Sequence, residues 1–372
     1  MDVHKELFFI RNLLLMLVAI VAVVIMKSLS GILLPLVLAV LMSVLFLPLI
    51  LFLEKKKFPT GISVALIAII TIGIILMVAN VFISTINEII SQQDYLVNQL
   101  YTKFQELAAL AAQIPYLEID AASLQSAINN LLSRDMLTSA ASGLFKGASS
   151  FGSSFLMFTL YFLFLLPGMS RYQHFIRYVG GNRESILEDY EKIQKNISTY
   201  MVIKSVISLI TGTIAWFICT VVGLKFAFFW GFLTFVLNFI PSIGSIIATI
   251  LPSLMGLILL DSFNEFILLA ALLGTNQLII GNVLDPRIMG NRMRLNTVTV
   301  LFGLVFWGVI WGIPGMLLSV PLSVTLKLIL EKSSSWSFLA RLMGSSVMAD
   351  DGTGHKKKRR SGRRKKTDPP NE

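Results

Sequence analysis

Apolar residues fill long runs of this chain, and short polar or charged segments separate the runs. A helix rises about 1.5 Å per residue, so about 20 apolar residues cross a hydrocarbon core of about 30 Å. The pattern therefore predicts an all-α polytopic membrane protein. Six runs predict full transmembrane helices: 13–26 with a turn added at each end, 32–53, 62–83, 147–166, 205–222 and 266–284.

The stretch 226–260 is apolar nearly throughout, but polar and helix-breaking residues interrupt its middle. Proline removes a backbone donor and disfavours helix at the preceding residue, while glycine permits a turn. Two arms of about 15 residues remain, each about 22 Å long and too short to span a bilayer. We expect a re-entrant helical hairpin, and a single long helix kinked at Pro241 is the alternative. The interrupting residues are Asn238, Pro241, Ser242, Gly244 and Ser245.

The stretch 297–330 is broken in the same way at Gly312, Pro314 and Gly315. In both stretches an Ile-Pro pair follows an aromatic-rich arm, which is a weak internal repeat. Inverted pairs of broken helices around a central site are typical of secondary transporters. We therefore expect six full transmembrane helices plus two re-entrant helical hairpins, whose tips shape and gate a central site. Eight transmembrane helices are the alternative.

Basic residues indicate the orientation in the membrane. Because lysine and arginine concentrate in cytoplasmic loops, Lys5, Arg11 and the lysines of 55–57 are expected on the cytoplasmic side. If 226–260 is a hairpin, the arginines of 285–294 are cytoplasmic as well; if it spans fully, they lie outside. We expect the hairpin arrangement, with both termini in the cytoplasm.

This order divides the chain into six parts. They are the first three spans (1–83), an extracytoplasmic amphipathic helical segment (84–146), the fourth span (147–168), a cytoplasmic helical segment (169–204), a C-terminal core with two broken helices (205–332) and a cytoplasmic tail (333–372), disordered and polybasic at its end.

Composition supports the membrane assignment, and the positions of the basic residues show where the net positive charge lies. Of the 372 residues 55% are hydrophobic and 14% are charged, whereas soluble domains have about 25% charged residues. The net charge of +10 comes largely from one run in the tail. Such a run near a membrane favours contact with anionic lipid over nucleic acid or a protein partner, and a merely solvated tail is the alternative. The run contains Lys356, Lys357, Lys358, Arg359, Arg360, Arg363, Arg364, Lys365 and Lys366.

Polar residues inside the apolar runs are the candidates for a substrate or ion pathway, because buried polar groups in membranes are costly and usually functional. Asn282 and Asp285 share a helix face, since they are three residues apart. Asp285 is the sole candidate for proton or cation coupling; a structural role at the interface, paired with Arg287, is the alternative. The residues expected around one hydrophilic pocket are Asn238, Ser242, Ser245, Asn276, Asn282 and Asp285.

Sequence motifs of several other classes are missing. There is no G-x-x-x-x-G-K-[ST] phosphate loop, no H-E-x-x-H zinc motif and no G-x-S-x-G hydrolase turn. Cys219 is the only cysteine, so a cysteine-based metal site is excluded. We expect no enzyme, no cofactor and no metal site. A non-transporting oligomeric membrane scaffold or regulator, and a channel, remain alternatives to a transporter.

Three segments resemble the AI-2E family of bacterial transporters: 239–245 followed by Pro252, 282–290 and 312–321. The likeness covers about 13–330. It implies a multi-pass secondary transporter or exporter of the bacterial cytoplasmic (inner) membrane. Family members are linked to export of the quorum signal autoinducer-2 or to sodium/proton exchange, so a small polar solute and Na⁺ or H⁺ are expected partners besides the lipid bilayer. The family also implies a homo-oligomer, with a pentamer among the sizes it suggests.

This chain departs from the family pattern at one place. The family often has an acidic residue just after the fourth span, where this chain has Leu166, Pro167 and Gly168. The tail after Ser333 has no counterpart in the family pattern.

Overall fold

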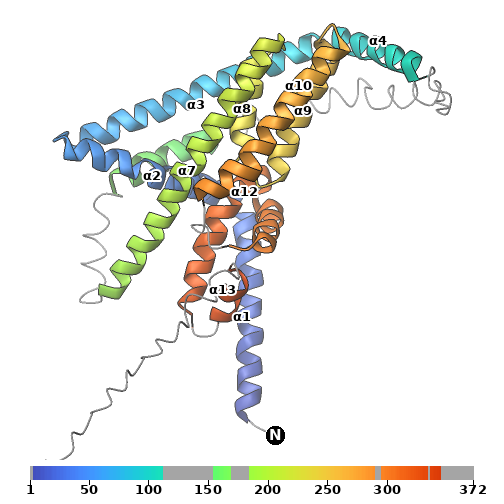
Figure 1. Ribbon diagram of the computed structural model, residues 1–372. Helices are drawn as coiled ribbons and strands as arrows, with labels where there is room; N and C mark the ends of the chain where they lie inside the picture. Colours follow the sequence, from blue (N-terminus) through green and yellow to red (C-terminus); the bar gives the residue numbers. More distant parts are fainter. Residues whose placement is uncertain (1–2, 112–153, 169–183, 290–294, 334–335, 345–372) are drawn as a thin grey trace, which may run out of the picture.

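The computed structural model describes residues 3–111, 154–168, 184–289, 295–333 and 336–344, and the described residues form helices and turns without a strand. Figure 1 shows one long helix, α7, crossing the molecule with the other core helices around it. The core helices are α7 (Glu184–Val222), α8 (Ala227–Leu237), α9 (Ile243–Leu259), α10 (Phe263–Ile279), the π-helix η1 (Ile280–Leu284), α11 (Asp285–Met289), α12 (Thr297–Glu331) and α13 (Ser337–Leu342).

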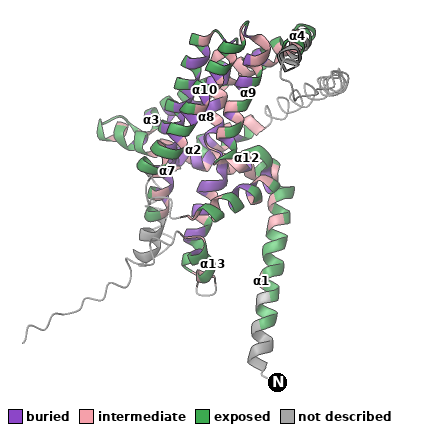
Figure 2. Cartoon of the chain, turned by 45° about the vertical axis from the view of Figure 1, so that its right-hand side comes forward, coloured by how far each residue is buried: buried purple, intermediate pink, exposed green. Residues whose placement is uncertain are grey.

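Four helices precede the core. They are α1 (Val3–Ser28), α2 (Ser30–Lys55), α3 (Thr60–Ser91) and α4 (Gln93–Ala111). Only Leu29 separates α1 from α2. Val23 and Met26 near the end of α1 pack against a cluster of α12, and the rest of α1 projects beyond the core helices in Figure 2. Its apolar surface therefore faces the surroundings of the chain rather than its core.

The first broken stretch is two helices joined by a turn. Ser242 has a φ of 59°, which interrupts the helical path. Phe229 near the start of α8 and Leu260 just after α9 belong to one core cluster, so the two helices run antiparallel. A Cβ on Gly244 would collide with the Leu237 carbonyl oxygen, which shows how closely the arms meet at the turn. The alternative of one long kinked helix is wrong.

The second broken stretch, α12, also folds back on itself. Gly312 has φ 65° and ψ −146°, a combination open essentially to glycine alone. In a straight helix Gly303 and Ser323 would lie about 30 Å apart. Here a Cβ on Gly303 would touch the Ser323 hydroxyl, and Trp307 Nε1 donates a hydrogen bond to the same oxygen at 3.2 Å. The predicted break at Gly312 is thus a reversal of the chain.

Small residues bring α7 and α8 into close contact. A Cβ on Gly212 would lie 2.7 Å from the Gly231 carbonyl oxygen. Helices in membranes pack through such small residues because lipid tails give no hydrophobic drive for association. Figure 2 shows buried residues where α2, α7, α8, α10 and α12 meet, whereas α1 is exposed. This dense centre is the frame that positions the candidate site.

Six helices of the described part are long and apolar enough to cross a membrane, by length and composition. The number of long apolar helices agrees with the six predicted spans, but the helices that make up the six are not all the same. The predicted fourth span appears as the shorter helix Ser154–Gly168, and α12 reaches spanning length only as the sum of two arms. The six are Phe9–Ser28, Ser30–Lys55, Thr60–Ser91, Glu191–Val222, Phe263–Ile288 and Thr297–Glu331.

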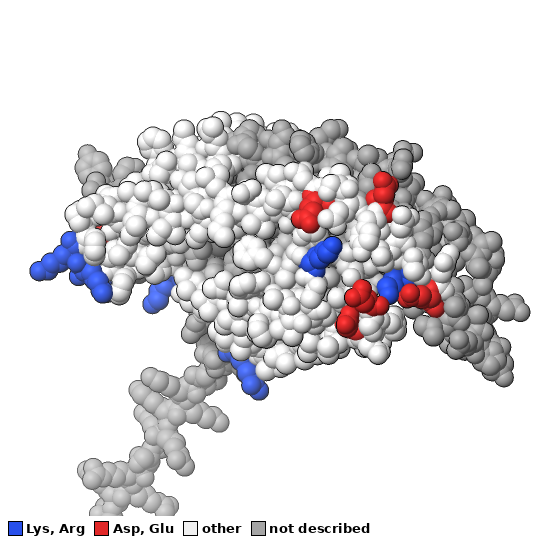
Figure 3. All heavy atoms as spheres, turned by 90° about the horizontal axis from the view of Figure 1, so that it is seen from above, with Lys and Arg blue, Asp and Glu red and all other residues white. Residues whose placement is uncertain are grey.

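Two predicted boundaries also move. The helical segment predicted before residue 205 and the fifth span form one continuous helix, α7, of 39 residues. The third span continues to Ser91, so α3 is longer than predicted and has 32 residues. Viewed from above in Figure 3, charged side chains form a few separate groups and leave most of the visible described surface uncharged. That distribution fits helices surrounded by lipid.

Candidate functional site

A cavity of about 890 Å³ lies beside the turn between α8 and α9. Its walls come from α7, the turn 238–242, α9, the segment from α10 to α11, and the start and second arm of α12. Residues from α7, the first hairpin, the α10–α11 segment and α12 therefore line one space. Its polar lining residues are Tyr200, Lys204, Asn238, Ser242, Ser245, Thr249, Gln277, Asn282, Asp285 and Thr297.

One face of α7 carries the polar contacts that hold the site together. Lys204, Ser208 and Thr211 are spaced four and three residues apart, which places them on one helix face. Asn238 Nδ2 donates to Ser208 Oγ at 3.0 Å, and Asn276 Nδ2 donates to the Thr211 carbonyl oxygen at 3.2 Å. Through these bonds α7 positions both the hairpin turn and α10.

The third contact of this face is an ion pair. Lys204 Nζ donates to Asp285 Oδ2 at 2.8 Å, with side-chain exposures of 8% and 22%. Charges taken out of water are costly unless they are paired with good geometry, so each partner depends on the other. This pair joins α7 to the start of α11 at the wall of the cavity.

Two oxygen atoms of cavity-lining side chains lack a hydrogen-bond donor among the described residues. They are Asp285 Oδ1 and Gln277 Oε1, and both belong to side chains that line the cavity. Gln277 is 8% exposed. Buried acceptors of this kind are normally paired, so each one needs an explanation.

The π-helix η1 sets the direction of these side chains. The Asp285 amide donates to the Ile280 carbonyl oxygen, five residues earlier, instead of to the residue four before it. Such π-segments are rare and frequent at functional sites. The extra residue in this turn lets Gln277, Asn282 and Asp285 all line the same cavity.

Most of the predicted pathway residues meet here. Asn238, Ser242, Ser245, Asn282 and Asp285 all line the cavity. Asn276 does not line it; its side chain is buried against α7. Arg287, the alternative partner of Asp285, is exposed, and among the described residues Asp285 forms its ion pair with Lys204 instead.

The two predicted tips have different positions. Pro241 lines the cavity, and Gly244 is buried just behind it. Gly312, Pro314 and Gly315 do not line it. The neighbouring Trp311 donates from Nε1 to the Met26 carbonyl oxygen at 3.1 Å, which places this tip by the junction of α1 and α2. The nine basic tail residues from Lys356 to Lys366 lie outside the described residues.

Sequence reasoning missed Tyr200, Lys204, Thr249 and Gln277 as lining residues. Lys204 was assigned to the cytoplasmic segment because basic residues precede it. The spacing of Lys204, Ser208 and Thr211 is a signal in the sequence, because residues four and three positions apart lie on one face of a helix.

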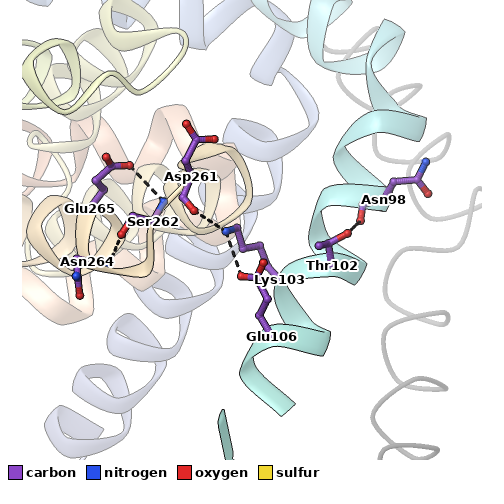
Figure 4. A network of polar contacts seen from close by, with 8 residues as sticks. All are labelled: Asn98, Thr102, Lys103, Glu106, Asp261, Ser262, Asn264 and Glu265. Atoms are coloured by element: carbon purple, nitrogen blue, oxygen red, sulfur yellow. Dashed lines mark hydrogen bonds and ion pairs between the residues drawn. The ribbon is translucent and has the colours of Figure 1, made fainter. Parts of the chain in front are cut away.

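A second polar network holds the far end of α9. Lys103 on α4 donates to the Asp261 carbonyl oxygen at 2.9 Å and pairs with Glu106 at 3.2 Å, as Figure 4 shows. Ser262 and Glu265 form a capping box that starts α10. These contacts fix the end of the hairpin that lies away from its turn.

Broken helices packed around a polar cavity define a class of protein. Non-helical backbone and buried charges at membrane depth are tolerated where they are enclosed by protein or face an aqueous cavity, and in transporters they form the substrate or ion site. The apolar helices and this site together indicate an integral membrane protein of the transporter class.

The chain belongs to the AI-2E family transporters, whose family model matches residues 13–335. The resemblance found in the sequence is thereby confirmed. This chain is similar to the AI-2 transport protein TqsA of Escherichia coli K12, with 32% identity over 319 residues that cover 84% of this chain and 90% of TqsA. It is also similar to "Putative transport protein YhhT" of Escherichia coli K12, with 28% identity over 85% of this chain and 88% of YhhT.

Proposed function

We propose that this protein is a secondary transporter and that its solute passes through the cavity beside the first hairpin. The observation that carries the proposal is the Lys204–Asp285 ion pair, which lies at the wall of a cavity next to a break in an apolar helix. Broken helices of this kind form the substrate or ion sites of transporters. The match to a transporter family supports the same function.

The lining favours a small polar solute. Asn238, Ser242, Ser245 and Asn282 offer neutral donors and acceptors, and the cavity volume of about 890 Å³ is ample for a small molecule. TqsA is named as a transport protein for AI-2. We propose an autoinducer-2-like solute moved outward, with the first hairpin turn as the moving wall.

Exchange of cations for protons is the second candidate function. The observation that favours it is the Asp285 carboxylate, whose Oδ1 has no donor among the described residues. A carboxylate in such a position can bind a cation or a proton.

The variant that tests this proposal is Asn238→Leu, which removes the hydrogen bond to Ser208 and one polar side chain from the cavity lining. Proteoliposomes holding the purified chain are loaded with labelled autoinducer-2, and release is followed under imposed sodium and proton gradients. We expect gradient-dependent release, reduced at least about tenfold in the variant, because a lost buried polar contact of about 1.5 kcal/mol corresponds to that factor.

The control is Asn98→Leu, an exposed position on α4 away from the cavity. A sodium-driven pH change without solute release would move the function to cation/proton exchange. If folded wild-type protein gives neither signal, the proposal is wrong, and the result favours a non-transporting membrane scaffold.

We also propose that both antiparallel hairpins are re-entrant in the bacterial inner membrane, with both termini cytoplasmic. The arms of the first have 11 and 17 residues, which is short for a hydrocarbon core of about 30 Å. A single cysteine at Asn291 in a Cys219→Ser background is expected to react only with membrane-permeant maleimide in intact cells. Labelling by an impermeant reagent from outside would refute this topology and favour eight spans.

Self-association is part of the same proposal. None of the most apolar window of Phe9–Ser28 is buried within the chain. Its surface is available to lipid and to a neighbouring copy, which fits the homo-oligomer expected from the family resemblance. The basic tail residues are proposed to contact anionic lipid.

A further inference from the structure

Lys204 reaches Asp285 from a different helix and takes one of its two carboxylate oxygens. The pair is 2.8 Å long, and within the described residues neither partner has another ion pair. A lysine ammonium is a compact single positive charge on a long flexible stem. It therefore resembles a small monovalent cation held on a tether.

Two oxygens of the cavity-lining side chains lack a hydrogen-bond donor in the described part of the chain. Asp285 Oδ1 and Gln277 Oε1 are buried without a donor among the described residues. Gln277 is more than nine-tenths buried and lines the cavity together with Asn282 and Thr249. A carboxylate oxygen without a donor, in a cavity that also offers neutral oxygens, suits a hard cation, which binds oxygen ligands.

The charge count favours a monovalent ion. Asp285 is the single carboxylate of the cavity lining, and no group of three His, Cys, Asp or Glu side chains in the described part of the chain is arranged to hold a metal ion. Calcium sites in proteins usually need several carboxylates. One carboxylate with neutral oxygens balances a single positive charge.

We propose that Asp285 is a monovalent-cation site and that the Lys204 ammonium competes with the cation for it. Without the ion, Lys204 neutralises Asp285. With the ion bound at the carboxylate, Lys204 moves off Asp285 into the cavity, which it also lines. The carboxylate then has a counter-charge in both states, and the cost of the exchange falls on the displaced Lys204 ammonium, which must be solvated in the cavity.

Competition makes a prediction that a purely structural salt bridge does not. If Lys204 occupies Asp285 about 90% of the time, the apparent affinity for a cation is lowered about tenfold. Lys204→Met keeps the apolar stem but removes the competitor. We expect this variant to bind Na⁺ or K⁺ at least about tenfold more tightly than the wild-type chain. If Lys204 only positions Asp285, its loss would leave cation affinity unchanged or weaker.

The experiment measures binding of ²²Na⁺ and ⁸⁶Rb⁺, the latter as a tracer for K⁺, to the full chain in nanodiscs at fixed pH in choline buffer. Asp285→Asn should abolish binding. Lys103→Met is the matched control, since it removes a lysine paired with Glu106 outside the cavity; it should leave affinity unchanged. Calcium should fail to compete.

Three results would overturn the proposal. They are no monovalent-cation binding by either the wild type or Lys204→Met, no gain of affinity in Lys204→Met, or binding that survives Asp285→Asn. If Lys204→Met does not fold, the proposal is tested with the wild-type chain. Sodium or potassium should raise the Tm of the wild type, and the Tm of Asp285→Asn should not respond to either ion.

This inference rests on the cavity being the transport site but is tested without flux. Solute release with no cation binding would refute the cation site alone. Cation binding without solute release or a sodium-driven pH change would instead refute the proposed function.

Discussion

Lys204→Met is expected to lower the free energy of unfolding by about 3 kcal/mol in buffer free of sodium and potassium. Removing one partner of a buried pair costs about 3–5 kcal/mol, because the remaining charge stays buried without compensation. The lower end applies here, since Asp285 keeps 22% side-chain exposure. Unfolding in mixed micelles with increasing denaturing detergent, followed by tryptophan fluorescence, measures this loss.

The double variant Lys204→Met/Asp285→Asn tests the physical cause of that loss. With both charges gone, most of the stability should return, to within about 1 kcal/mol of wild type, because replacing a buried pair by neutral groups is often close to neutral. Equal destabilisation of the single and double variants would show that Lys204 contributes packing rather than charge. Adding sodium to the single variant should restore part of its stability if the cation replaces the ammonium.

Gly312→Ala is expected to destabilise the protein by about 3 kcal/mol and to abolish gradient-driven release. The backbone at Gly312 has φ 65° and ψ −146°, a region that side-chain-bearing residues avoid at a cost of about 1–3 kcal/mol. No heavy atom lies within 4 Å of a Cβ built there, so the expected cost arises from the backbone and not from a clash. The same detergent unfolding and proteoliposome release assays measure both effects.

Gly73→Ala is the matched control for this substitution. Gly73 also has open space around a built Cβ, but it lies inside α3 with no positive φ. Alanine is favoured over glycine in a helix by about 1 kcal/mol, so this variant should be as stable as wild type or slightly more stable. A normal Gly312→Ala variant would contradict the chain reversal in α12.

The broken helices could be predicted from the sequence because their causes are local. Proline and glycine change the backbone where they stand, so Pro241 and Gly312 marked the two interruptions without knowledge of the fold. Polar residues in apolar runs likewise identified Asn238, Asn282 and Asp285, since their burial is costly wherever the chain folds.

The partners of these residues could not be predicted in the same way. Lys204 is 81 positions from Asp285, and its basic neighbours favour a cytoplasmic helical segment. The tip at Gly312 was expected at the central site, yet Trp311 packs beside Met26 at the junction of α1 and α2. Both outcomes depend on contacts between segments that are remote along the chain.

The sequence by itself determined the class of protein, the helical runs and the two places where helices break, because hydrophobic length and backbone chemistry act over a few residues. Only the tertiary structure decided which polar groups meet. It aligned the polar face of α7 with Asp285, Asn238 and Asn276, and it separated the two tips. The physical reason is that a buried charge or amide needs a hydrogen-bonding or charged partner nearby in space. The local sequence is compatible with several such partners, and only the packing of the helices determines which one is close enough.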